Sequence, residues 1–213
     1  MTYALSYLND RLKIAAVTWD VKRTDELSGT GDGRIWQSEL APPLWTAQVD
    51  LQVGWTHELK QIAALIRSLR GAQEPFLLCD PTSKFPNADP SGLKLGGADP
   101  YVATAGVDRS LITLAGLPAN YRLTIGDKFE LSYGASPVRY GFYEISQDVT
   151  SSGSGVTPQF KIFPELPNSV PINTYVKLIR PACRCIIIPG SHNPGSASPG
   201  KTEGATFKVI QKK

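Results

Sequence analysis

The residues of this sequence that could carry out chemistry are few and stand far apart along the chain. Its 213 residues include three cysteines, Cys79, Cys183 and Cys185, and two histidines, His57 and His192. In a strand, Cys183 and Cys185 would point to the same face and could hold a soft metal. Because only Cys79 and two isolated histidines could complete the ligand set, we interpret the pair as small buried side chains. We expect no metal site.

Two glycine-rich stretches match catalytic or phosphate-binding loops only in part. The segment "SSGSGV" (151–156) approaches the spacing of a nucleophile elbow, but no helix is predicted to follow it. The segment "GTGDG" (29–33) lacks the surrounding strand and helix and the lysine that a P-loop requires. Asp80, beside Cys79, is interpreted as part of an Asp-Pro turn. We therefore expect no catalytic residue, no bound cofactor and no enzyme activity.

Aromatic side chains offer one further chemical possibility. Trp36, Trp45 and Trp55, with Tyr140 and its neighbours Phe142 and Tyr143 in the range 140–143, could form a platform for a sugar ring. Packing in the core or at a subunit interface is the interpretation we favour. Trp55 lies at a predicted junction between a strand and a helix, where it could fix the entry of the helix or anchor a neighbouring subunit.

The composition indicates a folded protein with many turns. Hydrophobic residues make up 41% and charged residues 19% of the chain, as in globular domains. The 19 glycines and 17 prolines are spread along the sequence, a pattern typical of short strands joined by turns. The net charge of +3 is too small to indicate nucleic acid as the main partner.

Neither a membrane span nor a secretion signal is predicted. No apolar run approaches the roughly 20 residues that a spanning helix needs. The first residues, "MTYALSYLND", lack the basic region and apolar run of a signal peptide. We therefore expect the protein to be made and folded in the cytosol, with no direct contact to membrane or nucleic acid.

The clearest structural pattern is the alternation that begins at Trp45. Apolar residues occupy every second position, which predicts a strand with one buried face. These residues are Trp45, Ala47, Val49, Leu51 and Val53.

A helix over 56–70 is predicted directly after this strand. Thr56 could cap it with its hydroxyl, and Gly71 is well placed to end it. The apolar residues then recur at helical spacing and form one stripe. The stripe consists of Leu59, Ile62, Leu65, Ile66 and Leu69. Together with the three tryptophans, Leu59, Ile62, Ile66 and Leu69 are our candidates for packing or subunit-interface residues.

The other segments predict two domains. A first strand is expected at 12–19, a loop at 23–33 and a short strand at 34–40, ended by Pro42 and Pro43. A buried strand at 75–81 precedes an irregular segment, several short strands follow over 101–179, and a flexible loop is expected at 189–204. We therefore predict a mainly β (α+β) fold: a β-sandwich core with one amphipathic helix, from 1–80 plus 180–213, and an inserted small β-barrel or sandwich over 81–179.

The order of these elements resembles the distal tail proteins of long-tailed phages, prophages and phage-like particles. The likeness covers most of the chain and is one of pattern, with no short diagnostic motif. It is carried by "LWTAQVDLQV", "HELKQIAALIRSLRG" with "PFLLCDP", the middle strands "SLITLAGLP", "LTIGDKFEL", "RYGFYEI" and "FKIFPEL", and the closing "ATFKVI".

The resemblance implies a structural protein of the virion tail tip or baseplate. Its copies would form a ring, expected to be a hexamer, that joins the tail tube protein to the hub and tip proteins, with tail fibres as further possible partners. The chain has no room for the large carbohydrate-binding domain that some of these proteins carry. Alternatives are another tail component, such as a tube, terminator or hub-associated protein, and a carbohydrate-binding β module built from 101–179.

Overall fold

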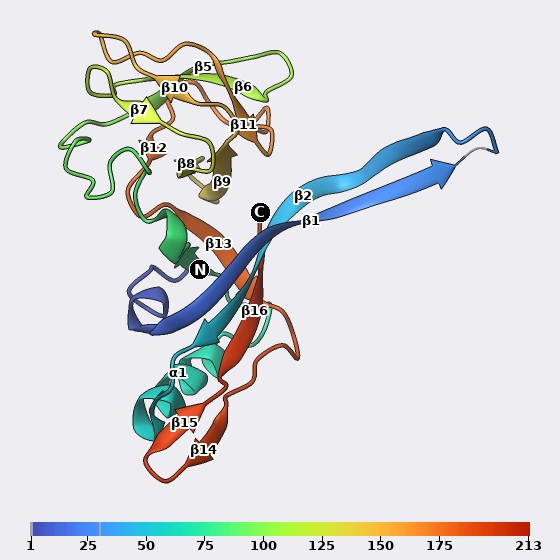
Figure 1. Ribbon diagram of the computed structural model, residues 1–213, viewed down its shortest axis with the longest axis vertical. Coiled ribbons are helices and arrows are strands. Elements are labelled where there is room, and N and C mark those ends of the chain that lie inside the picture. The colour runs from blue at the N-terminus through green and yellow to red at the C-terminus, as the bar shows by residue number, and fades with distance from the viewer. Residues whose placement is uncertain (1, 30) are drawn as a thin grey trace. The chain divides into compact units, whose positions relative to one another are not determined.

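The computed structural model describes residues 2–29 and 31–213 and is mainly β, which confirms the predicted fold class (Figure 1). Within these residues, α1 (Thr56–Ser68) is the single α-helix, and two short 3-10 helices lie at Asn9–Arg11 and Pro81–Ser83. The chain forms two compact units. Unit 1 comprises Met1–Phe76 with Cys185–Lys212, and unit 2 comprises Leu77–Arg184 with Lys213. The sequence analysis placed the corresponding boundaries at 80 and 180.

A five-stranded sheet has the strand order β1-β2-β16-β13-β4. Its strands are β1 (Ile14–Gly29), β2 (Ile35–Leu51), β16 (Thr206–Gln211), β13 (Ala182–Ile187) and β4 (Phe76–Cys79). Strand β2 is central only over Thr46–Asp50, where it pairs with β1 on one side and with β16 on the other. The rest of β2 pairs with β1 alone.

The predicted alternation places one face of β2 in the core of unit 1. Trp45, Ala47, Val49 and Leu51 are buried, as is Phe207 on β16. Val53 is an exception, because β2 ends at Leu51 and leaves this side chain exposed. The chain then enters β3 (Gly54–Trp55), which pairs with β15 (Lys201–Glu203) instead of β16.

The helix α1 closes this core with the predicted apolar stripe. Leu59, Ile62 and Ile66 border one small void together with Leu51 and Phe207, so the helix packs on the sheet. The burial of such side chains, at about 1.5–3 kcal/mol each, is what keeps a helix of this length in place.

Both predicted ends of the helix need correction. Trp55 is the N-cap residue and no side chain caps the helix, so the assignment of Thr56 as the cap was wrong. Thr56 is the first helical residue, and its hydroxyl accepts a bond of 3.3 Å from Thr202 on β15. The helix ends at Ser68 instead of 70, because Arg70 and Gly71 take positive φ angles of 51° and 64°.

The predicted loop at 23–33 is wrong over 23–29, which belong to β1, although 31–33 form a turn, and the predicted break at 41–43 is wrong as well. The structure has one long hairpin instead, in which β2 continues through Pro42 and Pro43. Proline is excluded from central strands because it cannot donate to a neighbour. These prolines lie beyond the part of β2 that pairs with β16, and the register with β1 shifts beside them, so no third strand needs their missing N–H groups.

The segment expected to be the most flexible loop, 189–204, contains a hairpin. Strand β14 (Ser196–Ser198) pairs with β15, which joins it to β3 in a three-stranded sheet. Three-residue strands are too short to produce a visible alternation, which is why the sequence pattern missed them.

Unit 2 is built on a six-stranded sheet with the order β12-β8-β9-β11-β6-β5. Its strands are β5 (Tyr101–Ala105), β6 (Leu111–Ala115), β8 (Lys128–Tyr133), β9 (Arg139–Ile145), β11 (Phe160–Phe163) and β12 (Val176–Lys177). The two end strands approach one another at the bridge between Tyr101 and Tyr175, so the sheet is a nearly closed barrel. A short pair, β7 (Arg122–Leu123) with β10 (Val149–Thr150), is added beside it.

The barrel encloses an apolar core. Its fully buried side chains come from alternate positions of the strands, as the pleat requires. They include Ile112, Leu114, Leu123, Phe129, Leu131, Ile145, Phe160 and Val176.

Gly155 offers a sharp test of this packing. It has a φ of +77°, and a Cβ atom added there would lie 2.1 Å from the carbonyl oxygen of Leu117. Gly155→Ala should therefore lower the free energy of unfolding by about 2–4 kcal/mol. Gly153→Ala is the matched control, since nothing lies within 4 Å of its added Cβ. Urea unfolding of the two variants measures the difference, and equal midpoints would contradict the described loop.

Candidate functional site

The structure separates the seven candidate packing or interface residues into two groups. Five of them are buried inside unit 1, where they pack within the chain. The buried five are Trp45, Leu59, Ile62, Ile66 and Leu69. Trp36 and Trp55 are exposed, at 65% and 56% of their accessible surface, and are available to a partner.

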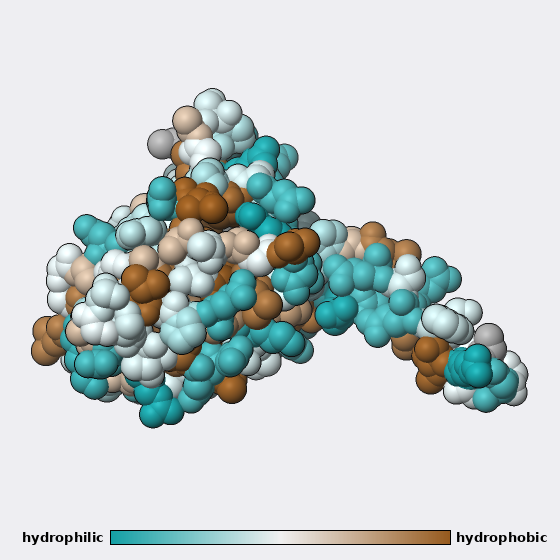
Figure 2. All heavy atoms as spheres, turned by 90° about the horizontal axis from the view of Figure 1, so that it is seen from above, coloured by the Kyte–Doolittle hydropathy of each residue, from teal (hydrophilic) through white to brown (hydrophobic). Residues whose placement is uncertain are grey.

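Trp36 belongs to a projecting part of the β1–β2 hairpin that we call the arm, residues 22–44, of which Thr30 lies outside the described residues. The arm extends past the end of β16, so only two strands form it (Figure 1). Four large apolar side chains on it are exposed by more than 60%: Leu27, Ile35, Trp36 and Leu40. Figure 2 shows hydrophobic residues interrupting the otherwise hydrophilic surface of this projection.

The register places apolar side chains on both faces of the arm. Leu27 pairs with Gln37, and Ile35 pairs with Gly29, so Leu27 and Ile35 share one face. Trp36, the next residue after Ile35, points to the opposite face. Leu40 stands between the pairs Glu39–Asp25 and Ala41–Thr24, as the extra residue of a bulge. A ribbon with water on both sides would carry polar residues on both faces. Neither face of the arm is purely polar.

Polar side chains connect the two strands of the arm. The Arg23 guanidinium lies 2.6 Å from the Asp25 carboxylate and 3.4 Å from that of Glu39, and Gln37 also donates to Asp25. The bond from Arg23 is the main cause that holds the pKa of Asp25 below its usual value. Solvent-exposed pairs of this kind contribute little to stability, so they order the arm without replacing a core.

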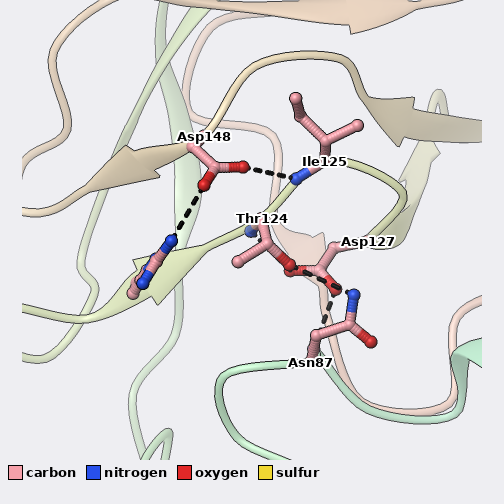
Figure 3. A network of polar contacts seen from close by, with 6 residues as sticks. Asn87, Thr124, Ile125, Asp127 and Asp148 are labelled. Atoms are coloured by element: carbon pink, nitrogen blue, oxygen red, sulfur yellow. Dashed lines mark hydrogen bonds and ion pairs between the residues drawn. The ribbon is translucent and has the colours of Figure 1, made fainter.

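Several carboxylates of unit 2 hold loops in place. Asp127 is buried and accepts bonds of 2.8 Å from the Asn87 N–H and 2.7 Å from the Thr124 N–H (Figure 3). Asp148 accepts from the Ile125 N–H at 2.9 Å in the same network. These oxygens are occupied by backbone donors, which is the arrangement of a structural carboxylate and leaves little for catalysis.

A buried ion pair also has a structural role. Lys128 and Asp80 form it, and Asp80 also accepts a bond of 2.9 Å from the Thr82 N–H as the cap of a 3-10 helix. Asp80 follows β4 in the predicted Asp-Pro turn, which confirms that interpretation. A further buried carboxylate, Glu130, accepts from the Ala182 N–H at 2.9 Å and from Lys177 at 3.1 Å.

The three cysteines are buried and placed for packing, whereas His57 is exposed and His192 is half-buried. Burial raises the pKa of the Cys79 thiol to about 11, so it remains protonated and unreactive near neutral pH. Cys183 and Cys185 are both fully buried on β13. Burial, and then the charge of Arg67, lower the pKa of His192. Among residues 2–29 and 31–213, no three His, Cys, Asp or Glu side chains gather as a metal ion would require.

No protein-family model matches the chain, and no curated protein sequence matches it. In the part of the chain that the structure describes, no helix is long and apolar enough to cross a bilayer.

The sequence analysis singled out only Trp36 of the exposed residues on the arm. Leu27, Ile35 and Leu40 were missed because they fall in 23–40, which was divided into a loop and a short strand. The available signal was the presence of large apolar residues in an otherwise polar stretch.

The buried Asp89 of unit 2 gives a testable pH dependence. Burial raises its pKa, but backbone donors at Leu95 (2.9 Å) and Lys94 (3.2 Å) and the Tyr121 hydroxyl (3.2 Å) bring the pKa below its usual value. Since the folded pKa is lowered, this stabilisation is present above the unfolded pKa of about 3.9 and is lost as pH falls through the folded value.

Asp89→Asn should therefore unfold more easily than the wild type at pH 7, and the difference should shrink between about pH 4 and pH 2. Tyr121→Phe removes one donor and should shift the loss to higher pH. Urea unfolding of unit 2 followed across this range measures both effects. A difference between wild type and Asp89→Asn that does not vary with pH would contradict the role of Asp89.

Proposed function

We propose that this chain is a structural subunit of a phage tail tip, in which copies form a hexameric ring between the tail tube and the central hub. The arm is the observation that carries the proposal. It is a two-stranded ribbon with exposed apolar side chains on both faces, Leu27 and Ile35 on one and Trp36 on the other. The sequence resemblance to distal tail proteins supplies the kind of assembly.

An uncovered arm is physically unfavourable for a chain that works alone. A two-stranded hairpin without a further layer is only marginally stable in water. Covering Leu27, Ile35 and Trp36 would contribute about 1.5–3 kcal/mol for each side chain. The outer edge of β1 is also open, since β1 is the end strand of its sheet. Open edges and apolar patches of this kind fit a chain whose surface is completed by neighbours.

Contacts between an arm and a different surface of the next copy are heterologous. Such contacts form a ring when the rotation that relates successive copies brings the last copy back to the first. The partners proposed with this ring are the tail tube protein and the hub and tip proteins, with tail fibres as further partners. The place of action is the virion tail tip. Its work is to hold these parts together, with no reaction catalysed and no cofactor bound.

The proposal predicts that the wild-type protein forms rings with a central channel and that the arm is needed for them. Leu27→Ser combined with Trp36→Ser should raise the protein concentration required for assembly at least tenfold, because at least about 1.4 kcal/mol of burial is lost at each contact. Light scattering after size-exclusion chromatography gives the mass, and negative-stain microscopy gives the ring.

Leu93→Ser combined with Val107→Ser is the matched control, since it removes from unit 2 two apolar side chains that are even more exposed than Leu27 and Trp36. The control should assemble as the wild type does, and at a dilution at which none of them assembles all the proteins should have the same melting temperature. A wild type that stays monomeric at high concentration and with tail tube protein would overturn the ring. Locating the chain in tail particles by cryo-electron microscopy separates this role from that of a tube or terminator protein.

A further inference from the structure

A shallow recess of about 470 Å³ opens on the surface of unit 2, at the seam where the barrel nearly closes. Four side chains line it: Asp99, Tyr101, Asn173 and Tyr175. None of the sequence patterns pointed to this place. The recess is widely open to solvent, so it could hold a ligand against one of the ligand's faces only.

The seam sets the two tyrosines side by side. The Val102 N–H donates to the Thr174 carbonyl at 3.0 Å, and the Val176 N–H donates to the Pro100 carbonyl at 2.8 Å. Tyr101 and Tyr175 lie opposite one another between these two bonds and form a pair without backbone hydrogen bonds between them. Side chains are closest in pairs of this type. The two tyrosine residues are 36% and 49% exposed, so both side chains reach the solvent at the seam.

Two local features position the polar residues beside these rings. Asn173 has a φ of 67° and its N–H donates to the Val102 carbonyl at 2.8 Å, so Asn173 and Thr174 together oppose one residue in a bulge. On the other side, a Cβ atom on Gly116 would lie 2.6 Å from the Asp99 carbonyl oxygen and 3.3 Å from the Tyr101 ring. Only glycine at 116 allows the chain at Asp99 and Tyr101 to approach this closely.

The polar ends of the four side chains remain available to a ligand. Within the described residues, the two phenols, the Asp99 carboxylate and the Asn173 amide have no hydrogen-bonding partner. Burial raises the pKa of the Tyr175 phenol, and the carboxylates of Asp99 and Glu130 raise it further. The phenol therefore stays protonated and can donate, while Asp99 stands close enough to act on the same ligand.

We propose that this recess binds a pyranose ring of a carbohydrate. The apolar C–H face of a sugar can stack on the adjacent tyrosine rings, which present an apolar body with a polar tip. Asp99 accepts hydrogen bonds from sugar hydroxyls, and such bonds to a charged acceptor are the stronger kind. Asn173 and the phenols can both donate and accept, as alternating hydroxyls require.

The site differs from the aromatic platform considered from the sequence. It contains neither Trp36 nor Tyr140, and it lies entirely in unit 2. It is also independent of the proposed ring, which depends on the arm in unit 1. A single sugar in so shallow a recess should bind with a dissociation constant on the order of 1 mM. Dense display on a surface raises the apparent affinity.

The test uses the full-length protein on a printed array of bacterial surface polysaccharides and simple pyranosides, at high glycan density. The strongest binder is then studied in solution by saturation-transfer NMR. We expect wild-type binding to fall at least tenfold in Tyr175→Thr and in Asp99→Asn. Threonine keeps the preference for extended backbone at the seam, and asparagine keeps the shape of Asp99 while removing its charge.

Tyr140→Thr is the matched control, because this partly exposed tyrosine on β9 does not line the recess. It should bind as the wild type does, and equal melting temperatures for all variants exclude unfolding. Absence of wild-type binding across the array overturns the proposal, as does binding that Tyr175→Thr and Asp99→Asn leave unchanged. If Tyr175→Thr instead lowers the oligomeric mass and leaves glycan binding intact, the recess is a protein contact and the proposal fails, whereas the ring proposal stands.

Discussion

The structure of unit 1 depends on the length of β2. This strand is much longer than the segment of it that has a neighbouring strand on each edge. Over Thr46–Asp50 the strand has neighbours on both edges and a helix over its apolar face. Pro43 is still buried, but from Pro42 back to Ile35 the strand has one neighbour and all its residues are exposed. The same strand therefore supplies the most buried and the most exposed apolar residues of the hairpin, Val49 at 0% and Ile35 at 73%. Because burial of apolar surface is the main stabilising force, such an uncovered extension is explained best by a partner that covers it.

Unit 2 solves the problem of open edges in another way. Its sheet nearly closes on itself, so that its end strands bond to one another through Val102, Thr174 and Val176. Three buried carboxylates fix loops to this sheet. Asp127, Asp89 and Asp80 each accept hydrogen bonds from backbone N–H groups outside the strands. A buried carboxylate that is fully hydrogen-bonded stabilises one conformation. The seam is the place where the closure leaves polar side chains with free bonding capacity, and a ligand can use it.

The two surfaces suit two different kinds of partner. The arm presents apolar side chains with few polar groups between them, as protein contacts do. The recess combines two aromatic rings with a carboxylate and an amide, as sites for polar ring-shaped molecules do. The proposed subunit contact and the proposed sugar site therefore belong to different units of the chain.

The sequence by itself determined the elements whose pattern is long enough to be unambiguous. Alternation from Trp45 to Leu51 and helical spacing from Leu59 to Leu69 fixed a strand and a helix, because each repeats its period several times. It could not determine how far a strand continues past its sheet, so Pro42 and Pro43 were read as a break. Nor could it find β14 and β15, which have three residues each. Only the tertiary structure decided that Trp45 is buried while Trp36 is exposed, and that Tyr101 meets Tyr175 across more than 70 residues. The physical reason is that burial and juxtaposition depend on which strands become neighbours, and strand neighbours are set by contacts between segments far apart in the chain.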